Sequence, residues 1–255
     1  MAAMDHLLLD ARDGWVRLVL NRPGAKNALN TALLGDLAGT LGRLAADDGC
    51  RSVLLCGAEG NFAAGADIGE IEHKSGAEGA ADPRKAHWAA IRAFPKPLVA
   101  AVDGFALGGG LELALMADLL VAGTTARMGL PESNLGLIPG AGGGQRLMAR
   151  IGPARAARMV LTGEIIDAAT AFGWGLASHL AEGPAEEEGA ALAAKLAARA
   201  PLALAAAKRA LVEGAEAALA LAAERAGFEA LLDSADKAEG IRAFREKRRP
   251  VYRGR

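Results

Sequence analysis

The chain has 255 residues, about half of them apolar, which is enough to bury the core of one large domain. Its 29 basic residues nearly balance its 30 acidic ones, for a formal net charge of −1. This balance argues against nucleic acid as the main partner, because a surface that follows phosphates needs a basic excess.

The N-terminal part is predicted to alternate strands and helices. Residues 15–20 alternate in the manner of a strand and end at a turn signal over 21–24. Asn30 can cap a helix whose leucines recur at intervals of three and four. A second strand over 53–56 leads into a Gly/Ala loop over 60–67. Strand, helix and strand at this spacing predict an α/β fold in which helices cover a sheet.

The middle of the chain begins with a polar, aperiodic segment over 72–83, which predicts a mobile loop. The elements predicted after it are a helix over 84–94, strands over 98–102, 119–122 and 127–130, a helix over 111–116, and a helix that begins at Gln145.

From about residue 186 the pattern becomes helical, with few β signals. Helices are predicted over 191–200, 202–212, 217–232 and 237–246. Their apolar faces need a partner, which is either the core of this chain or another subunit. We expect a domain boundary near residue 195.

The chain shows no sign of metal binding, export or membrane insertion. Cys50 and Cys56 flank or lie in a buried strand and are interpreted as reduced core thiols, and the four histidines have no ligand spacing. The first six residues lack the pattern of an export signal, and no apolar run is long enough to span a membrane. We therefore expect a cytoplasmic protein without a metal.

Three consecutive glycines, Gly108 to Gly110, stand just before a predicted helix. Their backbone amides are unshielded and lie at the positive end of the helix dipole, where negative charge is favoured. Glu112 lies on the first turn of that helix. A tight turn with an acid that merely offsets the dipole would give the same pattern.

A second carboxylate strengthens the case for chemistry. Glu132 follows a short strand, at the kind of position where functional groups of α/β sheets gather, and another glycine run follows over 140–144. One exposed glutamate is usually a solvated charge. Two glutamates beside a glycine-lined pocket are a candidate acid/base pair, because repulsion and burial can raise the pKa of one of them.

The loop over 63–68 offers a second amide donor, Ala66 N–H. Two amides directed at one developing oxyanion are worth about 3–4 kcal/mol each in a transition state. Such a pair suits enolate chemistry on a thioester, and no nucleophile motif that would indicate hydrolysis accompanies it. Trp88 and Phe94 could line an acyl pocket, although helical spacing is more typical of core residues.

Together these residues resemble the crotonase superfamily, the enoyl-CoA hydratases and isomerases. The segment 99–119 (VAAVDGFALGGGLELALMADL) is similar to the family signature throughout its length. Matching pieces on either side are NRPGAKNALN, FAAGADI, GLPESNLGLIPGAGGGQRL and FREKRRP. The resemblance implies a spiral of ββα repeats with the active site over 1–195. It also implies a helical trimerisation region over 196–255, in a homotrimer or homohexamer.

The family's hydratases carry both carboxylates, so the resemblance implies syn addition of water to a trans-2-enoyl-CoA, through an enolate, to give a 3-hydroxyacyl-CoA. Glu132 would activate the water, and Glu112 would hold that water and help deliver a proton to C2. The amides of Ala66 and Gly109 would form the oxyanion hole. The backbone amide of Gly140 would orient the catalytic carboxylate or the water.

The same resemblance implies an acyl-CoA substrate and no separate cofactor. The residues expected to contact coenzyme A are Lys26, Ala64, Asp67, Ile68 and Gly69, together with Phe244 and Lys247 from this chain or a neighbouring subunit. Gly144, Leu111 and Ser133 depart from residues that are frequent in the family, which leaves the acyl specificity open.

Two other functions remain open: a double-bond isomerase that uses the same enolate, and a catalytically silent acyl-CoA-binding subunit. The presence of both glutamates favours hydration over either. Segments 83–88, 200–204 and 252–255 are similar to bacterial hydratases of phenylacetate catabolism, which act on 2,3-dehydroadipyl-CoA.

Overall fold

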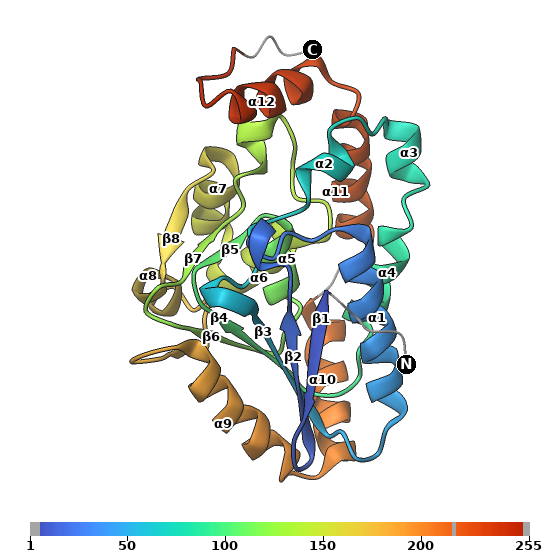
Figure 1. Ribbon diagram of the computed structural model, residues 1–255, viewed down its shortest axis with the longest axis vertical. Helices are drawn as coiled ribbons and strands as arrows, with labels where there is room; N and C mark the ends of the chain where they lie inside the picture. The colour runs from blue at the N-terminus through green and yellow to red at the C-terminus, as the bar shows by residue number, and fades with distance from the viewer. Residues whose placement is uncertain (1–5, 216–217, 252–255) are drawn as a thin grey trace.

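The computed structural model describes residues 6–215 and 218–251. It contains a six-stranded sheet of order β1-β2-β3-β4-β6-β9 and a three-stranded sheet of order β5-β7-β8 (Figure 1). The strands are β1 (Leu7–Ala11), β2 (Trp15–Leu20), β3 (Ser52–Gly57), β4 (Leu98–Val102), β5 (Phe105–Leu107), β6 (Leu119–Ala122), β7 (Arg127–Gly129), β8 (Ile165–Asp167) and β9 (His179–Leu180).

Helices surround both sheets (Figure 1). In the first half of the chain they are α1 (Thr31–Ala46), α2 (Ile68–Ile71), α3 (Gly76–Ala80), α4 (Arg84–Arg92) and α5 (Gly109–Ala114), with 3-10 turns η1 (Pro23–Ala25) and η2 (Ala58–Gly60). In the second half they are η3 (Glu132–Leu135), α6 (Gly143–Ile151), α7 (Pro153–Thr162), α8 (Ala168–Gly173), α9 (Ala185–Ala197), α10 (Pro201–Ala215), α11 (Ala218–Leu231) and α12 (Ala235–Arg245).

The chain winds through the two sheets in repeated turns. Strands β2, β3, β4, β6 and β9 run parallel, and only β1 joins the large sheet antiparallel. Each of the units β4-β5-α5 and β6-β7-α6 places one strand in the large sheet, one in the small sheet and then a helix. Stacking of these units confirms the predicted α/β spiral of ββα repeats.

The central strands β3, β4 and β6 of the large sheet are buried on both faces, which explains their nearly continuous apolar sequences. One face, with Leu18 and Leu55, packs in the main core with the leucines of α1. The other face, with Leu54 and Val99, packs against α9. Helix α9 thus belongs to the sheet, and it ends at Ala197, two residues beyond the expected domain boundary.

The elements with a clear period are found close to where the sequence predicts them. The Asn30 side chain caps α1 by accepting a hydrogen bond from Leu33 N at 2.9 Å. The elements β1, α7, β8, α8 and β9 were not predicted. In β1, for example, Leu8 and Leu9 are 47% and 45% exposed although both are apolar. The sequence of this strand therefore lacks the alternation of apolar and polar residues that would have predicted it.

The prediction of a mobile loop over 72–83 was wrong, because this segment contains helix α3. Ser75 and Glu78 form a capping box at the start of this helix. Gly79 lets α3 approach α11 closely, since a β-carbon there would lie 2.4 Å from Leu232 Cδ1. Capping and a tertiary contact order the segment, and neither leaves an apolar period in its sequence.

Charged contacts fix the end of the same segment. Asp82 is almost completely buried and accepts hydrogen bonds from Arg84 Nη2 at 2.6 Å and Lys74 Nζ at 2.8 Å. Burial alone would raise the pKa of Asp82, but these donors outweigh it and hold the pKa below its usual range. The carboxylate therefore stays ionised and binds both cations.

The cysteines and the lengths of the apolar helices also bear on the sequence-based predictions. Cys50 and Cys56 are buried free thiols, as predicted, and burial raises the pKa of Cys56 to about 12. Within the described ranges, no single helix is long and apolar enough to cross a membrane; α9 and the first part of α10 pass that test only as a pair bent by 111°. The export-signal prediction falls mainly on residues 1–5, and one quoted similarity on 252–255, which are outside the described residues.

Leu37→Ala should lower the free energy of unfolding by about 2–5 kcal/mol, because Leu37 is fully buried under the sheet and its truncation leaves a cavity. Urea unfolding at fixed protein concentration measures this loss. Leu161→Ala on α7 is the control; it should change stability by less than about 0.5 kcal/mol, since Leu161 is 76% exposed. Equal losses in the two variants would contradict the assigned core.

Candidate active site

The turn from β5 into α5 is built from glycines that neighbouring groups crowd. Gly108 has φ 49° and ψ −126°, a conformation that L-residues avoid. A β-carbon on Gly108 would lie 3.0 Å from Glu132 Oε1, and one on Gly110 would lie 2.1 Å from Ala63 O. The glycines therefore allow both a carboxylate and a second backbone segment to approach the start of α5.

The second backbone segment is the loop over 63–66. Ala63 bridges to β5 by donating to Phe105 O at 2.8 Å and accepting from Leu107 N at 3.1 Å. At the other end of the loop, a β-carbon on Gly109 would lie 3.5 Å from Ala66 N. The amides of Ala66 and Gly109 thus lie close together, and within the described chain neither donates a hydrogen bond to another residue. Such a pair suits a carbonyl oxygen that becomes anionic.

Glu112 lies on the first turn of α5 and is 4% exposed. Its Oε1 accepts hydrogen bonds from Ala141 N at 2.7 Å and Gly143 N at 2.9 Å. Burial raises the pKa of Glu112, while these amides, that of Gly140 and the charge of Arg146 act in the opposite direction. The result is a buried carboxyl that can hold a proton at higher pH than an exposed glutamate.

Glu132 approaches the same place from the other side. It begins η3, directly after β7 and Pro131, and its Oε1 lies against the backbone of Gly108. Its carbonyl accepts from Leu137 N at 3.0 Å, which closes the turn. Helix α12 packs on η3, so a C-terminal helix of this same chain supports the turn that carries Glu132.

Arg146, which is 9% exposed on α6, was not among the residues predicted from the sequence. Its Nη1 donates to Ala141 O at 2.7 Å, in the turn that binds Glu112. One signal was available: Arg146 lies three residues after Gly143 and next to Leu147, both buried, so helical spacing places it on the inward face of α6.

The first two residues expected to bind coenzyme A lie together. Ala64 N donates to Lys26 O at 3.0 Å, and the Lys26 ammonium lies 4.9 Å from the centre of the Phe105 ring. Buried Asn27, which was also missed, ties this turn down through hydrogen bonds to Ala58 O and Asn61 O. Lys26 is exposed on a turn that is fixed beside the oxyanion loop.

The next three expected residues form the start of α2. Asp67 caps this helix by accepting from Gly69 N at 3.1 Å, and α2 begins at Ile68. The Asp67 carboxylate also pairs with Arg22 Nη2 at 2.9 Å. Arg22, a further missed residue, thus joins the Lys26 turn to α2.

The segment that carries Phe244 and Lys247 is joined to the C-terminal end of α2, because Arg245 forms an ion pair with Glu72. Phe244 and Lys247 are exposed near the end of α12, and Phe244 is 61% exposed. Within the described residues, neither side chain is hydrogen-bonded or ion-paired to the group from Lys26 to Gly69. The part of Phe244 and Lys247 in the expected coenzyme A site stays a prediction.

Helix α11 closes the site near Gly140. A β-carbon on Gly140 would lie 3.0 Å from the Phe228 ring. The guanidinium of Arg225 stacks on that ring, with 5.0 Å between its carbon and the ring centre. Phe228 is therefore a better candidate for an acyl-pocket wall than Trp88 or Phe94, which pack with the main core.

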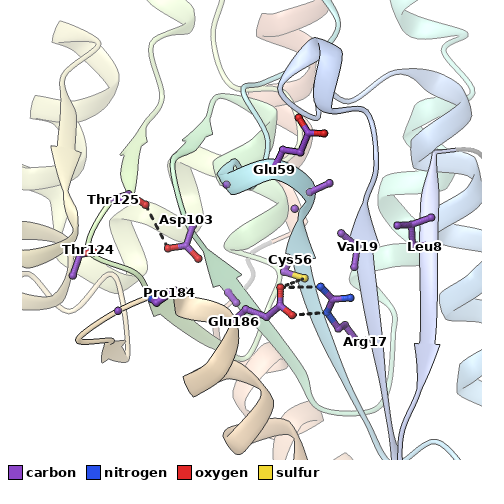
Figure 2. Close-up of a pocket in the computed structure, with 15 residues that line it drawn as sticks. Leu8, Arg17, Val19, Cys56, Glu59, Asp103, Thr124, Thr125, Pro184 and Glu186 are labelled. Atoms are coloured by element: carbon purple, nitrogen blue, oxygen red, sulfur yellow. Dashed lines mark hydrogen bonds and ion pairs between the residues drawn. The ribbon is translucent and has the colours of Figure 1, made fainter.

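A separate hollow of about 540 Å³ lies on the α9 face of the large sheet (Figure 2). Figure 2 shows Arg17 paired there with Glu186, and Asp103 hydrogen-bonded to Thr125. The Arg17 Nε–Glu186 Oε1 distance is 2.7 Å, and Asp103 also accepts from Ala185 N at the start of α9. None of the predicted catalytic or coenzyme A residues lines it. Among the described residues, no cluster of three or more His, Cys, Asp or Glu side chains could hold a metal ion.

Comparison with known proteins gives consistent matches. A family described as enoyl-CoA hydratase/isomerase matches residues 11–255. The chain is 47% identical to 2,3-dehydroadipyl-CoA hydratase of Escherichia coli, over 99% of this chain and 100% of that protein. It is 41% identical to a probable enoyl-CoA hydratase of Rhizobium meliloti, over 98% and 99% of the two chains.

Solved structures agree. Carnitinyl-CoA hydratase from Mycobacterium avium has a TM-score of 0.87 at 35% identity and covers 98% of this chain and 99% of its own. An enoyl-CoA hydratase/isomerase from Pseudoalteromonas atlantica has a TM-score of 0.87 at 32% identity, covering 97% and 100%. The similarity thus extends over nearly the whole chain.

Gly110→Ala should destabilise the fold by at least about 1–3 kcal/mol, because its β-carbon would meet the fixed carbonyl of Ala63. Thermal unfolding measures the effect. Gly173→Ala, where a β-carbon meets nothing within 4 Å, is the matched control and should leave the melting temperature nearly unchanged. A Gly110 variant as stable as this control would contradict the contact between α5 and the oxyanion loop.

Proposed function

The chain belongs to the enoyl-CoA hydratase/isomerase family, and on this premise we propose that it is a hydro-lyase that adds water across C2 and C3 of a trans-2-enoyl-CoA. One observation carries the proposal. Two backbone amides, Ala66 and Gly109, donate to no other residue in the described part of the chain, and they lie beside two carboxyl groups at a single strand-to-helix turn. Stabilising an enolate and moving protons to and from it requires these groups together.

The amides of Ala66 and Gly109 would bind the thioester oxygen. As water adds at C3, the electrons of the double bond move toward the carbonyl, and its oxygen becomes anionic. The Gly109 amide is at the start of α5, where intrahelical acceptors are missing and the helix dipole favours an anion. Donors already in place for this charge lower the barrier without reorganisation.

The two glutamates would divide the proton transfers. Ionised Glu132 takes a proton from the water as its oxygen bonds to C3. Protonated Glu112, which holds the water, gives a proton to C2, and a proton passing from Glu132 to Glu112 restores the starting state. Burial of Glu112 supports this assignment, because it raises the pKa and favours the protonated form. Gly140 N–H would orient Glu112.

The substrate's coenzyme A would run along the surface formed by the Lys26 turn and the start of α2. The residues of this surface are Lys26, Ala64, Asp67, Ile68 and Gly69. Exposed Phe244 and Lys247 would reach it from a neighbouring subunit. We therefore propose a homotrimer, alone or paired into a hexamer, in the cytoplasm. The exposed apolar side chains of Leu202 and Leu211 on α10 support such an assembly.

We further propose that the natural acyl group carries a distal carboxylate, as in 2,3-dehydroadipyl-CoA, and that the enzyme serves phenylacetate catabolism. The similarity to the Escherichia coli hydratase of that name supports this proposal. Arg225 lies on the Phe228 ring beside Gly140, and its charge is already paired with Glu229 at 2.8 Å, so it does not add to this support.

Glu132→Gln should lower kcat for crotonyl-CoA hydration by about 100- to 10,000-fold, because the amide cannot accept the proton from water. Loss of the ultraviolet absorbance of the conjugated thioester measures the rate. Coenzyme A affinity should stay near that of the unaltered protein. Glu187→Gln, an exposed glutamate on α9, is the control.

Three outcomes of this assay would count against the proposal. Equal rates in the two variants would show that the water is activated elsewhere. If the unaltered protein consumes none of a series of short, long and carboxylated 2-enoyl-CoAs, the hydratase assignment fails. If a 3-enoyl-CoA is converted faster than any 2-enoyl-CoA is hydrated, the chain is an isomerase.

The distal carboxylate can be tested with a matched pair of substrates. We expect kcat/KM for 2,3-dehydroadipyl-CoA to exceed that for neutral 2-hexenoyl-CoA by at least about tenfold, because a site built around a polar partner discriminates against its absence. Equal values, or a preference for the neutral substrate, would contradict the proposed acyl group.

A further inference from the structure

The carboxyl of Glu112 is enclosed by one short turn. The amides of Ala141 and Gly143 donate to its Oε1 at 2.7 and 2.9 Å. Gly143 also packs against the side chain, since a β-carbon there would lie 2.8 Å from Glu112 Cγ. The position of Glu112 therefore depends on how firmly this turn is held.

Arg146 holds that turn from the opposite side. Its Nη1 donates to Ala141 O at 2.7 Å, so Ala141 donates to Glu112 through its amide and accepts from Arg146 through its carbonyl. The guanidinium is almost completely buried at 9% exposure, where a hydrogen bond from a charged donor is strong. A buried cation is costly, and its retention here calls for a specific interaction.

From this geometry we infer that Arg146 is a positioning residue for the hydration: it fixes the Ala141 turn and thereby the place and the charge state of Glu112. The inference rests on the proposed function. Arg146 contacts neither the expected water nor the enolate in this assignment. It acts through Ala141 and through the field of its charge.

Electrostatics support the same role. Burial raises the pKa of Glu112, and Arg146 opposes that rise. Arg146 from α6 acts on Glu112 through its charge, and Glu132 from η3 lies against Gly108 at the N-terminus of α5. Without Arg146 the pKa of Glu112 would rise further. In the proposed mechanism Glu112 works protonated, so the basic limb of the pH–rate profile would move to higher pH.

The chain offers a matched control one turn along α6. Arg150 is also substantially buried, and its Nη2 donates to Leu115 O at 3.0 Å and Ala117 O at 2.7 Å. It fixes the far end of α5 rather than the turn at Glu112. Arg146 and Arg150 thus differ in which end of α5 they hold.

The test compares Arg146→Gln, Arg146→Lys and Arg150→Gln in crotonyl-CoA hydration across pH, with thermal unfolding of each variant. Arg146→Gln should lower kcat by about 100-fold with little change in KM, since a small displacement of a catalytic group costs that much. Its basic limb should move to higher pH. Arg146→Lys keeps the positive charge, so the basic limb of its pH–rate profile should lie at the same pH as in the unaltered protein. Arg150→Gln should lose stability and leave the limb in place.

A second readout does not need activity. The infrared band of the protonated Glu112 carboxyl, assigned by its loss in Glu112→Gln, should persist to higher pH in Arg146→Gln than in the unaltered protein or in Arg150→Gln. If the band and the rate profile of Arg146→Gln match those of Arg150→Gln, the inference is wrong. If no variant or unaltered protein hydrates crotonyl-CoA or a carboxylated 2-enoyl-CoA, the proposed function fails, and the infrared titration still decides the role of Arg146.

Discussion

The contact between Ala63 and the first turn of α5 is the constraint on which the rest of the site depends. Ala63 joins β5 through two backbone hydrogen bonds, and Gly110 packs so closely on its carbonyl that no side chain fits. This contact sets the Ala66 amide beside the Gly109 amide. It also fixes the direction in which α5 leaves the sheet, and hence the place of Glu112.

Around this contact, the protein buries charged side chains and stabilises them by hydrogen bonds to backbone amides and carbonyls. Glu112 is buried and receives amide donors from one turn, and Arg146 binds that turn through its carbonyl. An isolated buried carboxylate would be costly, so burial raises the pKa of Glu112, and these donors and the charge of Arg146 oppose that rise. A carboxyl whose pKa lies above that of an exposed glutamate suits proton donation.

Sequence patterns were most reliable where a single element creates its own signal. The leucines of α1 and the apolar strands β4 and β6 were found because burial imposes a period or an unbroken apolar run. The capped helix α3 was predicted as a mobile loop because Gly79 and buried Asp82 carry no such signal. Its order comes from α11 and the residues just after it, more than 130 residues away in the chain: Arg225 donates to Gly79 O, and Asp233 accepts from Gly76 N.

Residue patterns alone were enough to predict the α/β class, the glycine turn before α5, the Ala66 amide as a donor, and the two glutamates as a candidate pair, because backbone freedom and residue chemistry are local properties. Resemblance to a family added Gly109 as the second donor. Which groups meet follows from the tertiary structure. It places Arg146 behind Ala141, Arg22 on Asp67, and Phe228 over Gly140. Such pairings join distant parts of the chain, and no local period records them.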